Sequence, residues 1–254
     1  MPPHLHLGKY YRYLWEDTQL LAVIGYFPEV LVSKRLYEER HNIRTTRPDA
    51  LPTLHRLMGA TTLAAVSLSE RESWGWTVTL PGMDVGFFCG VEPEGIVSAQ
   101  IRTAPSARQT VYVQRRKGAA PMTQSVFEPL SDDPVAAVKR YFDQAVQLET
   151  RIVLDGENSG VLVQPLPGGQ FSTVKDLEDG KLIELFRQMA SRGELEPVGE
   201  VVLFYECRCN DQMILDMITT LPQADREAVW GDETSLTIEC PRCGREYTLE
   251  RKKQ

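Results

Sequence analysis

Apolar residues recur at steps of three and four over residues 51–68, which is the spacing of one buried face of an α-helix. The residues on that face are Leu54, Leu57, Met58, Thr61, Leu63, Ala64 and Leu68. Residues 18–36 are apolar with mixed charge, and residues 33–40 show a second helical pattern. Pro48 and Pro52 interrupt the chain between the two patterns, so two separate helices are predicted.

After the helix predicted at 51–68, the apolar residues recur every second position, which predicts β-strands with one buried face. The apolar positions of two alternating runs are Trp74, Trp76, Val78, Leu80, Val85, Phe87, Cys89 and Val91. Pro81 and Gly82 break the alternation between the runs, and residues 92–95 have the composition of a turn. A third strand is predicted at 96–101 and a further one at 111–114. This order of strands and short turns predicts a β-meander.

A helix start signal follows at Ser131, Asp132, Asp133 and Pro134, which combine polar capping residues, acids and an early proline. The apolar face after it consists of Val138, Tyr141, Phe142, Ala145 and Leu148. Two more strands are predicted at 151–154 and 161–164. The segment 166–169, Leu-Pro-Gly-Gly, then marks a boundary.

Beyond that boundary a weaker helix is predicted at 177–190, and an extended apolar run at 198–205 leads to a group of cysteines. The elements together predict an α+β fold in three parts. An N-terminal β-sheet domain with packed helices covers 1–168, a helical connector covers 169–206, and a small C-terminal module covers 207–254.

The distribution of charge along the chain supports this division into three parts. The 254-residue chain has a net charge of −7, and residues 169–206 alone hold 4 basic and 8 acidic side chains. An acidic segment of modest hydrophobicity between two folded parts indicates a connector of low stability. An acidic chain also repels phosphate backbones, so no nucleic-acid partner is expected. The densest basic run, Arg115-Arg116-Lys117, is interpreted as a solvated turn.

The sequence has no apolar run of 18 residues, so no membrane partner is expected. Its start lacks the charged and apolar layout of a signal peptide, which favours a cytoplasmic location. Thiols stay reduced there, so five cysteines favour metal or redox chemistry over a disulfide framework.

Four cysteines form two pairs, Cys207 with Cys209 and Cys240 with Cys243, separated by 30 residues. Paired thiolates at such a spacing supply the four soft ligands that Zn²⁺ prefers in a tetrahedral site. Pro241 and Gly244 would shape the second pair into a tight metal-binding turn. The nearby arginines, Arg208, Arg242 and Arg245, are expected to favour the thiolate form. We therefore predict one structural Zn²⁺ held by all four cysteines.

The same site has the chemistry of a switch. A module of 48 residues rarely folds without a crosslink or a metal. Zinc would contribute on the order of 10–16 kcal/mol to its folding free energy. Oxidising two ligands to a disulfide expels the metal and removes that contribution. Cys240 and Cys243 would close a less strained ring than Cys207 and Cys209, so their bridge is expected first.

The cysteine pattern resembles the heat shock protein 33 family of redox-regulated chaperones. The resemblance continues upstream, in the segments 141–151 (YFDQAVQLETR) and 160–167 (GVLVQPLP), and more diffusely around residues 40–68. It implies that residues 1–168 bind clients, that 169–206 form a metastable connector and that 207–254 form a redox switch. It also implies a reduced, zinc-loaded, inactive monomer. Oxidation then forms two disulfides, Cys207–Cys209 and Cys240–Cys243, releases zinc and unfolds the connector. The resemblance further implies that the oxidised protein tends to form homodimers and holds unfolded client proteins without ATP, as part of a stress response.

Other classes of function are weaker. In a thiol–disulfide oxidoreductase the cysteine pair lies at the start of a helix. The residues after Gly244 have an extended pattern instead, which argues against that class for Cys240 and Cys243. A constitutive structural-zinc module, for protein interaction or nucleic-acid binding, is the main alternative. Cys89 is expected to be a buried free thiol, and the four histidines, His4, His6, His41 and His55, are expected to be tail or structural residues. No phosphate loop or nucleophile motif points to an enzyme.

Overall fold

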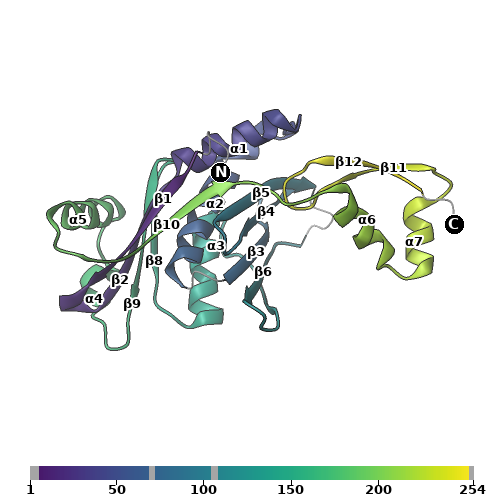
Figure 1. Cartoon of the computed structure of the whole chain (residues 1–254). Helices are drawn as coiled ribbons and strands as arrows, with labels where there is room; N and C mark the ends of the chain where they lie inside the picture. Colours follow the sequence, from purple (N-terminus) through teal and green to yellow (C-terminus); the bar gives the residue numbers. More distant parts are fainter. Residues whose placement is uncertain (1–5, 69–71, 104–107, 252–254) are drawn as a thin grey trace.

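The computed structural model describes residues 6–68, 72–103 and 108–251. Within these ranges ten strands form one large sheet that bends around helix α2 (Leu51–Ser67), and two further strands form a small separate sheet (Figure 1). The strands of the large sheet are β1 (Gly8–Trp15), β2 (Leu20–Tyr26), β3 (Glu72–Thr79), β4 (Val85–Val91), β5 (Ile96–Thr103), β6 (Thr110–Lys117), β7 (Thr123–Phe127), β8 (Arg151–Asp155), β9 (Ser159–Pro165) and β10 (Glu196–Tyr205).

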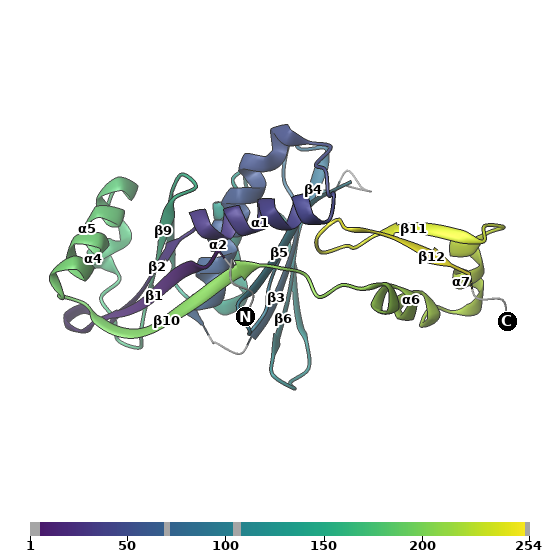
Figure 2. The same ribbon diagram turned by 45° about the horizontal axis from the view of Figure 1, so that its top comes forward.

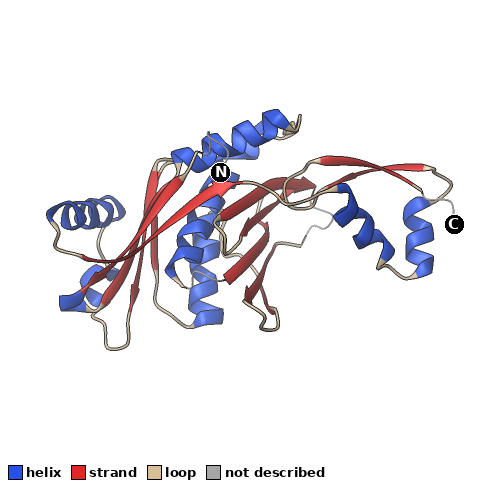
Figure 3. Ribbon diagram, viewed as in Figure 1, coloured by secondary structure: helices blue, strands red, loops and turns tan. Residues whose placement is uncertain are grey.

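Helices lie at both ends of the molecule as well as at its centre (Figure 3). The other helices are α1 (Pro28–Arg40), α3 (Pro134–Tyr141), α4 (Ser172–Lys175), α5 (Asp179–Arg192), α6 (Asp211–Thr219) and α7 (Gln223–Trp230). Short 3-10 helices occupy Glu16–Thr18 and Pro48–Ala50, and a π-helical turn, Phe142–Val146, extends α3. The small sheet pairs β11 (Ser235–Glu239) with β12 (Glu246–Glu250). None of the described helices has the length and apolar character needed to cross a membrane.

Strand β10 joins the two halves of the large sheet, whose order is β7-β6-β3-β4-β5-β10-β1-β2-β9-β8. It runs antiparallel to β1 over most of its length. Its last residues, Phe204 and Tyr205, pair in parallel with Ile96 and Val97 of β5. Gly95 permits this close approach, because its φ is +84° and a Cβ there would lie 2.3 Å from the carbonyl oxygen of Val202. The sheet is therefore continuous only through the end of a strand that comes late in the sequence.

Helix α2 packs against strands of both halves and carries the main core. Leu57, Leu63 and Ala64 are completely buried on it. Two of its three threonines are buried, and this is compensated because their hydroxyls donate to backbone carbonyls one turn earlier, Thr61 to Leu57 at 2.8 Å and Thr62 to Met58 at 2.7 Å. The helix predicted at 51–68 is thus confirmed, as is the β-meander, which forms β3, β4 and β5.

The opposite face of β2, β8 and β9 is covered by α4 and α5, which form a second core. Its buried members are Leu20, Ala22, Ile24, Val153, Val161, Val163, Phe171, Val174, Leu182, Ile183, Phe186, Met189 and Leu195. Seven of these come from residues 169–206, the predicted connector. That acidic segment thus supplies α4, α5 and the joining strand β10.

One expectation about an individual element needs revision, and two strands had not been predicted. The sequence pattern did not separate β1 and β2 as strands, because Tyr11, Tyr13 and Trp15 leave no polar face for a period of two. The run at 115–117 is the end of β6 rather than a turn. Arg115 there is paired with the buried Glu72. The helix start at Asp133 is confirmed, since its carboxylate accepts from the backbone of Val135 at 3.1 Å.

Candidate metal centre

The four paired cysteines come from two loops that meet beside the end of β10. Cys207 and Cys209 follow directly after β10, and Cys240 and Cys243 lie in the turn between β11 and β12. Helices α6 and α7 fill the interval between the pairs, and α6 is capped by Asn210, whose side-chain oxygen accepts from Met213 at 2.9 Å. Figure 2 shows this module at the opposite end of the molecule from α4 and α5.

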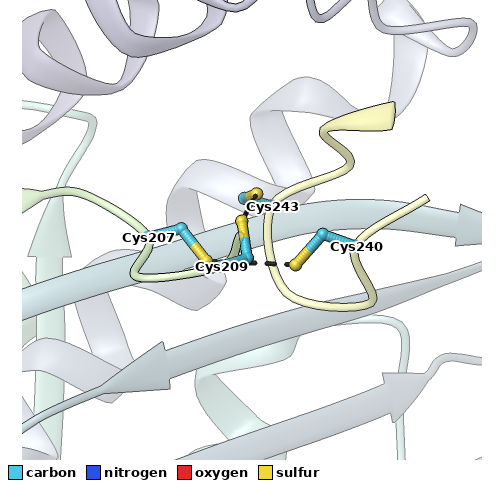
Figure 4. A group of neighbouring side chains, drawn as sticks. All are labelled: Cys207, Cys209, Cys240 and Cys243. Carbon is cyan, nitrogen blue, oxygen red and sulfur yellow. Dashed lines mark hydrogen bonds between the residues drawn. The ribbon is translucent and has the colours of Figure 1, made fainter. Parts of the chain in front are cut away.

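The sulfur atoms have the spacing that a tetrahedral zinc site requires. All four Sγ atoms lie within 4.8 Å of one another, with Cys207–Cys240 at 3.9 Å and Cys209–Cys243 at 3.5 Å (Figure 4). A tetrahedron with Zn–S bonds of about 2.3 Å has S···S edges of about 3.8 Å. All four side chains are buried, and the chain carries them as free thiols. The donor set therefore fits a metal ion that is bound by four sulfurs.

Hydrogen bonds within the module shape this arrangement. The amide of Cys240 donates to the carbonyl of Arg245 at 2.8 Å, and that of Gly244 donates to Cys240 at 2.9 Å. Gly244 has φ +78°, which favours glycine. The Tyr247 hydroxyl donates to the Cys209 sulfur at 3.0 Å and to its carbonyl oxygen at 2.8 Å. Both pairs are thereby held facing one another.

The thiols also adjust each other's acidity. Hydrogen bonding from Cys207 lowers the pKa of Cys209 and lowers the pKa of Cys240 to about 7. Hydrogen bonding with Cys209 raises the pKa of Cys207, and the pKa of Cys243 is raised as well. Two of the four thiols are therefore shifted toward the thiolate form that binds metal, and two are shifted away from it.

The neighbouring arginines dock the module against the large sheet. Arg242 pairs with Glu92 at 2.5 Å, and Arg208 pairs with Glu92 at 3.6 Å and with Glu94 at 3.1 Å. Both acids lie in the turn between β4 and β5. Arg245 instead stacks over Tyr247, with 4.9 Å between the guanidinium and the ring centre. We refer to Arg208, Arg242, Glu92 and Glu94 as the docking clasp. Two of the three arginines expected to favour thiolates therefore pair with carboxylates.

A residue that the sequence did not single out, Tyr37 of α1, reaches the cluster from the N-terminal part of the chain. Its hydroxyl oxygen is 3.5 Å from the Cys243 sulfur and 4.0 Å from the Cys209 sulfur. Burial raises the pKa of Tyr37, so the phenol keeps its proton. No local signal marks this residue, because it lies 172 positions before Cys209.

The remaining candidates lie apart from the cluster. Cys89 is buried on β4, its sulfur lies 2.9 Å from the Thr61 hydroxyl, and burial raises its pKa to about 12. It is the buried free thiol expected. His6 contacts Glu29 at 2.5 Å, and His55 contacts Glu157 at 2.7 Å. His41 stacks beside Tyr37 at 4.4 Å, while His4 lies outside the described residues.

The fold and the cluster together define an α+β protein in which a large sheet carries a small four-cysteine module. The family model described as Hsp33 protein matches residues 28–250, so the chain belongs to the Hsp33 family. The resemblance noted in the cysteine spacing is thereby confirmed.

The individual relatives have low sequence identity to this chain. A 33 kDa chaperonin of Hahella chejuensis (strain KCTC 2396) is 23% identical over 146 residues, 49% of this chain and 51% of that protein. One from Shewanella frigidimarina (strain NCIMB 400) is 26% identical over 132 residues, 45% of this chain and 46% of that protein. The chain thus spans about half the length of the curated relatives it matches.

The similarity in fold covers more of the chain than the similarity in sequence does. The crystal structure of the 33 kDa chaperonin (heat shock protein 33 homolog) from Thermotoga maritima matches with a TM-score of 0.66 at 18% identity, covering 97% of this chain and 95% of that one. The expected α+β architecture is therefore shown.

Proposed function

We propose that this chain is a redox-regulated, ATP-independent holdase, a chaperone that binds unfolded proteins without refolding them. In the reduced state Cys207, Cys209, Cys240 and Cys243 would hold one Zn²⁺. The ion would neutralise thiolate charge and crosslink the two loops. Oxidation would release it and expose an apolar surface. Relatives named 33 kDa chaperonins support this class.

The chemical step uses a peroxide as oxidant. One thiolate attacks a peroxide oxygen and becomes a sulfenic acid as the O–O bond breaks. A second thiolate then attacks that sulfur and displaces hydroxide, which leaves a disulfide and has passed two electrons to the peroxide. We expect Cys240–Cys243 and Cys207–Cys209 as the final pairs. Each disulfide removes two ligands.

The observation that carries the proposal is the position of β10. Cys207 lies two residues after the end of β10, which is the strand that joins the halves of the sheet and follows α5 in the chain. Tyr205 is tied at this end, because its amide donates to Ser33 at 2.8 Å and its hydroxyl donates to Ala99 at 2.7 Å. Release of the module would therefore free the end of β10 next to its shortest sheet pairing, that with β5.

The surface that would then open is the second core. Residues from α4 and α5 bury apolar side chains such as Leu182 and Phe186 against the sheet. Each such side chain stabilises the closed form by about 1.5–3 kcal/mol. The excess of acids in 169–206 would keep the opened segment soluble while the uncovered sheet face binds clients.

The test is suppression of aggregation of a thermally unfolding client, without ATP, by reduced and by peroxide-treated protein. Zinc release is followed in the same samples with a chromogenic chelator. We expect activity only after oxidation, together with release of one zinc per chain. A possible homodimer in the oxidised state would be detected by sedimentation.

A constitutive structural-zinc module is the second candidate. Burial of all four cysteines favours it, because buried thiolates are shielded from oxidants. Equal holdase activity in both redox states, or none in either, would support this alternative.

A further inference from the structure

We propose that Tyr37 is a positioning residue of the metal centre, supplied by the N-terminal part of the chain. Its hydroxyl donates a hydrogen bond to the thiolates of Cys243 and Cys209, so docking of the module controls how firmly the centre retains its metal and how fast it is oxidised. This inference rests on the proposed zinc site.

The Tyr37 ring is held by ring neighbours as well as by its contact with the sulfurs. It is buried, with 2% of its surface exposed. The Tyr205 ring packs edge-on against it at 5.3 Å, and His41 lies at 4.4 Å on another side. The hydroxyl thus lies at 3.5 Å from Cys243 and 4.0 Å from Cys209. A phenol that is protonated at neutral pH can only donate to a metal-bound thiolate.

A second phenol, that of Tyr247, can be compared with Tyr37. Tyr247 also donates to Cys209, but it belongs to β12 within the module. Tyr37 belongs to α1, far away in the sequence. Loss of docking would therefore remove the hydrogen bond from Tyr37 while that from Tyr247 remains.

Hydrogen bonds to metal-bound sulfur have a predictable effect. They withdraw charge from the sulfur, which makes it less nucleophilic and helps four thiolates to share one divalent ion. Changing an outer-shell partner of this kind typically lowers metal affinity by about 10–100-fold. Without Tyr37 the centre is expected to lose metal more readily and to react faster with peroxide.

The docking clasp offers an independent way to break the contact. Glu92 and Glu94 hold Arg208 and Arg242, and Gly244 lies so close to β5 that an added Cβ would be 2.9 Å from the Gln100 side chain. Glu92→Gln with Glu94→Gln removes the three ion pairs without touching a sulfur. The effect of Tyr37 should depend on the clasp, whereas the effect of Tyr247 should not.

The experiment compares full-length Tyr37→Phe, Tyr247→Phe and Tyr10→Phe, each with and without the two clasp substitutions. Tyr10 is the matched control, a buried phenol that donates to Thr62 at 2.9 Å, away from the cluster. The readouts are competition for Zn²⁺ with a chelator, the sulfur-to-metal charge-transfer band after Co²⁺ substitution, and the rate of peroxide-driven metal release. Tyr37→Phe should weaken metal retention about tenfold, shift the band and speed release.

In the clasp-free background, Tyr37→Phe should add less than in the intact chain, whereas Tyr247→Phe should add the same in both. Tyr10→Phe should change none of the three readouts. An unshifted Co²⁺ band and unchanged release in Tyr37→Phe would overturn the inference while leaving the holdase proposal intact. An equal effect of Tyr37→Phe in both backgrounds would contradict its dependence on docking. Failure of the unmodified chain to bind either metal would overturn both proposals.

Discussion

Residues 169–206 and residues 207–254 adjoin in the chain, but different interactions hold them. The first segment buries side chains such as Phe186 and Leu195 in a core shared with β2, β8 and β9. The second has few buried side chains, among them the four cysteines, Ile214 and Trp230, and these belong to the same cluster as the core around α2, while Met217 and Val229 are half exposed. Apolar burial cannot be removed by an oxidant, whereas thiolate ligation can. In the proposed function, the switch therefore belongs in the second segment and its consequence in the first.

The largest effect is expected from removing a metal ligand. Cys240→Ser should abolish zinc binding and unfold residues 207–254, because the metal would contribute about 10–16 kcal/mol to folding of so small a module. Zinc analysis and hydrogen exchange of the full chain measure both changes. Cys89→Ser is the matched control, since Cys89 is equally buried but lies outside the cluster. Retention of one zinc by Cys240→Ser would contradict the assignment.

The next largest effect is expected in residues 169–206 alone, without a change at the metal site. Phe186→Ala should cost about 3–5 kcal/mol, because Phe186 is completely buried and packs edge-on against Trp15 at 6.0 Å. We expect α5 to loosen while zinc stays bound, which would give holdase activity in the reduced protein. Aggregation assays and zinc analysis on one sample test this, with the exposed Glu184→Ala as control. Reduced Phe186→Ala that loosens α5 yet binds no client would show that this face is not the binding surface.

A smaller effect is expected at the boundary between module and sheet. Glu92→Gln should weaken docking by about 1 kcal/mol, since its ion pairs are partly exposed. Hydrogen exchange in the turn between β4 and β5 should rise, and high salt should reduce the difference from the unmodified protein. A variant at Glu128, which pairs with Arg108 far from the module, should leave this exchange unchanged.

The smallest expected effect is kinetic. Cys240–Cys243 should bridge before Cys207–Cys209, because a two-residue spacer closes a less strained ring than a single residue. Mass spectrometry of alkylated intermediates measures the order in which the two disulfides form. The short cross-pair sulfur distances, Cys209–Cys243 and Cys207–Cys240, define the competing outcome. A first bridge between the two pairs would show that proximity outweighs spacer length.

Much of the fold could be predicted because the relevant signals are local. The period of α2, the alternation of β3 and β4, and the cap at Asp133 each depend on a few neighbouring residues. The strands β1 and β2 escaped detection because both of their faces are apolar in places: one meets α2 and the other meets α5.

The meeting of the four cysteines was likewise predictable from spacing, since two short motifs of one residue type suffice to indicate a tetrahedral site. The docking clasp and Tyr37 were not, because each depends on contacts between segments that are distant in sequence. Glu92 and Arg242 are ordinary surface charges until the module is placed on the sheet.

The sequence by itself determined the fold class, the four cysteines that meet at one point, and the acidic character of the segment before them. These follow from composition and from periods of a few residues. Only the tertiary structure decided that β10 joins the two half-sheets and that Tyr37 lies against the cluster. Strand order and side-chain contacts across long separations depend on how whole elements pack, and no local pattern encodes that packing.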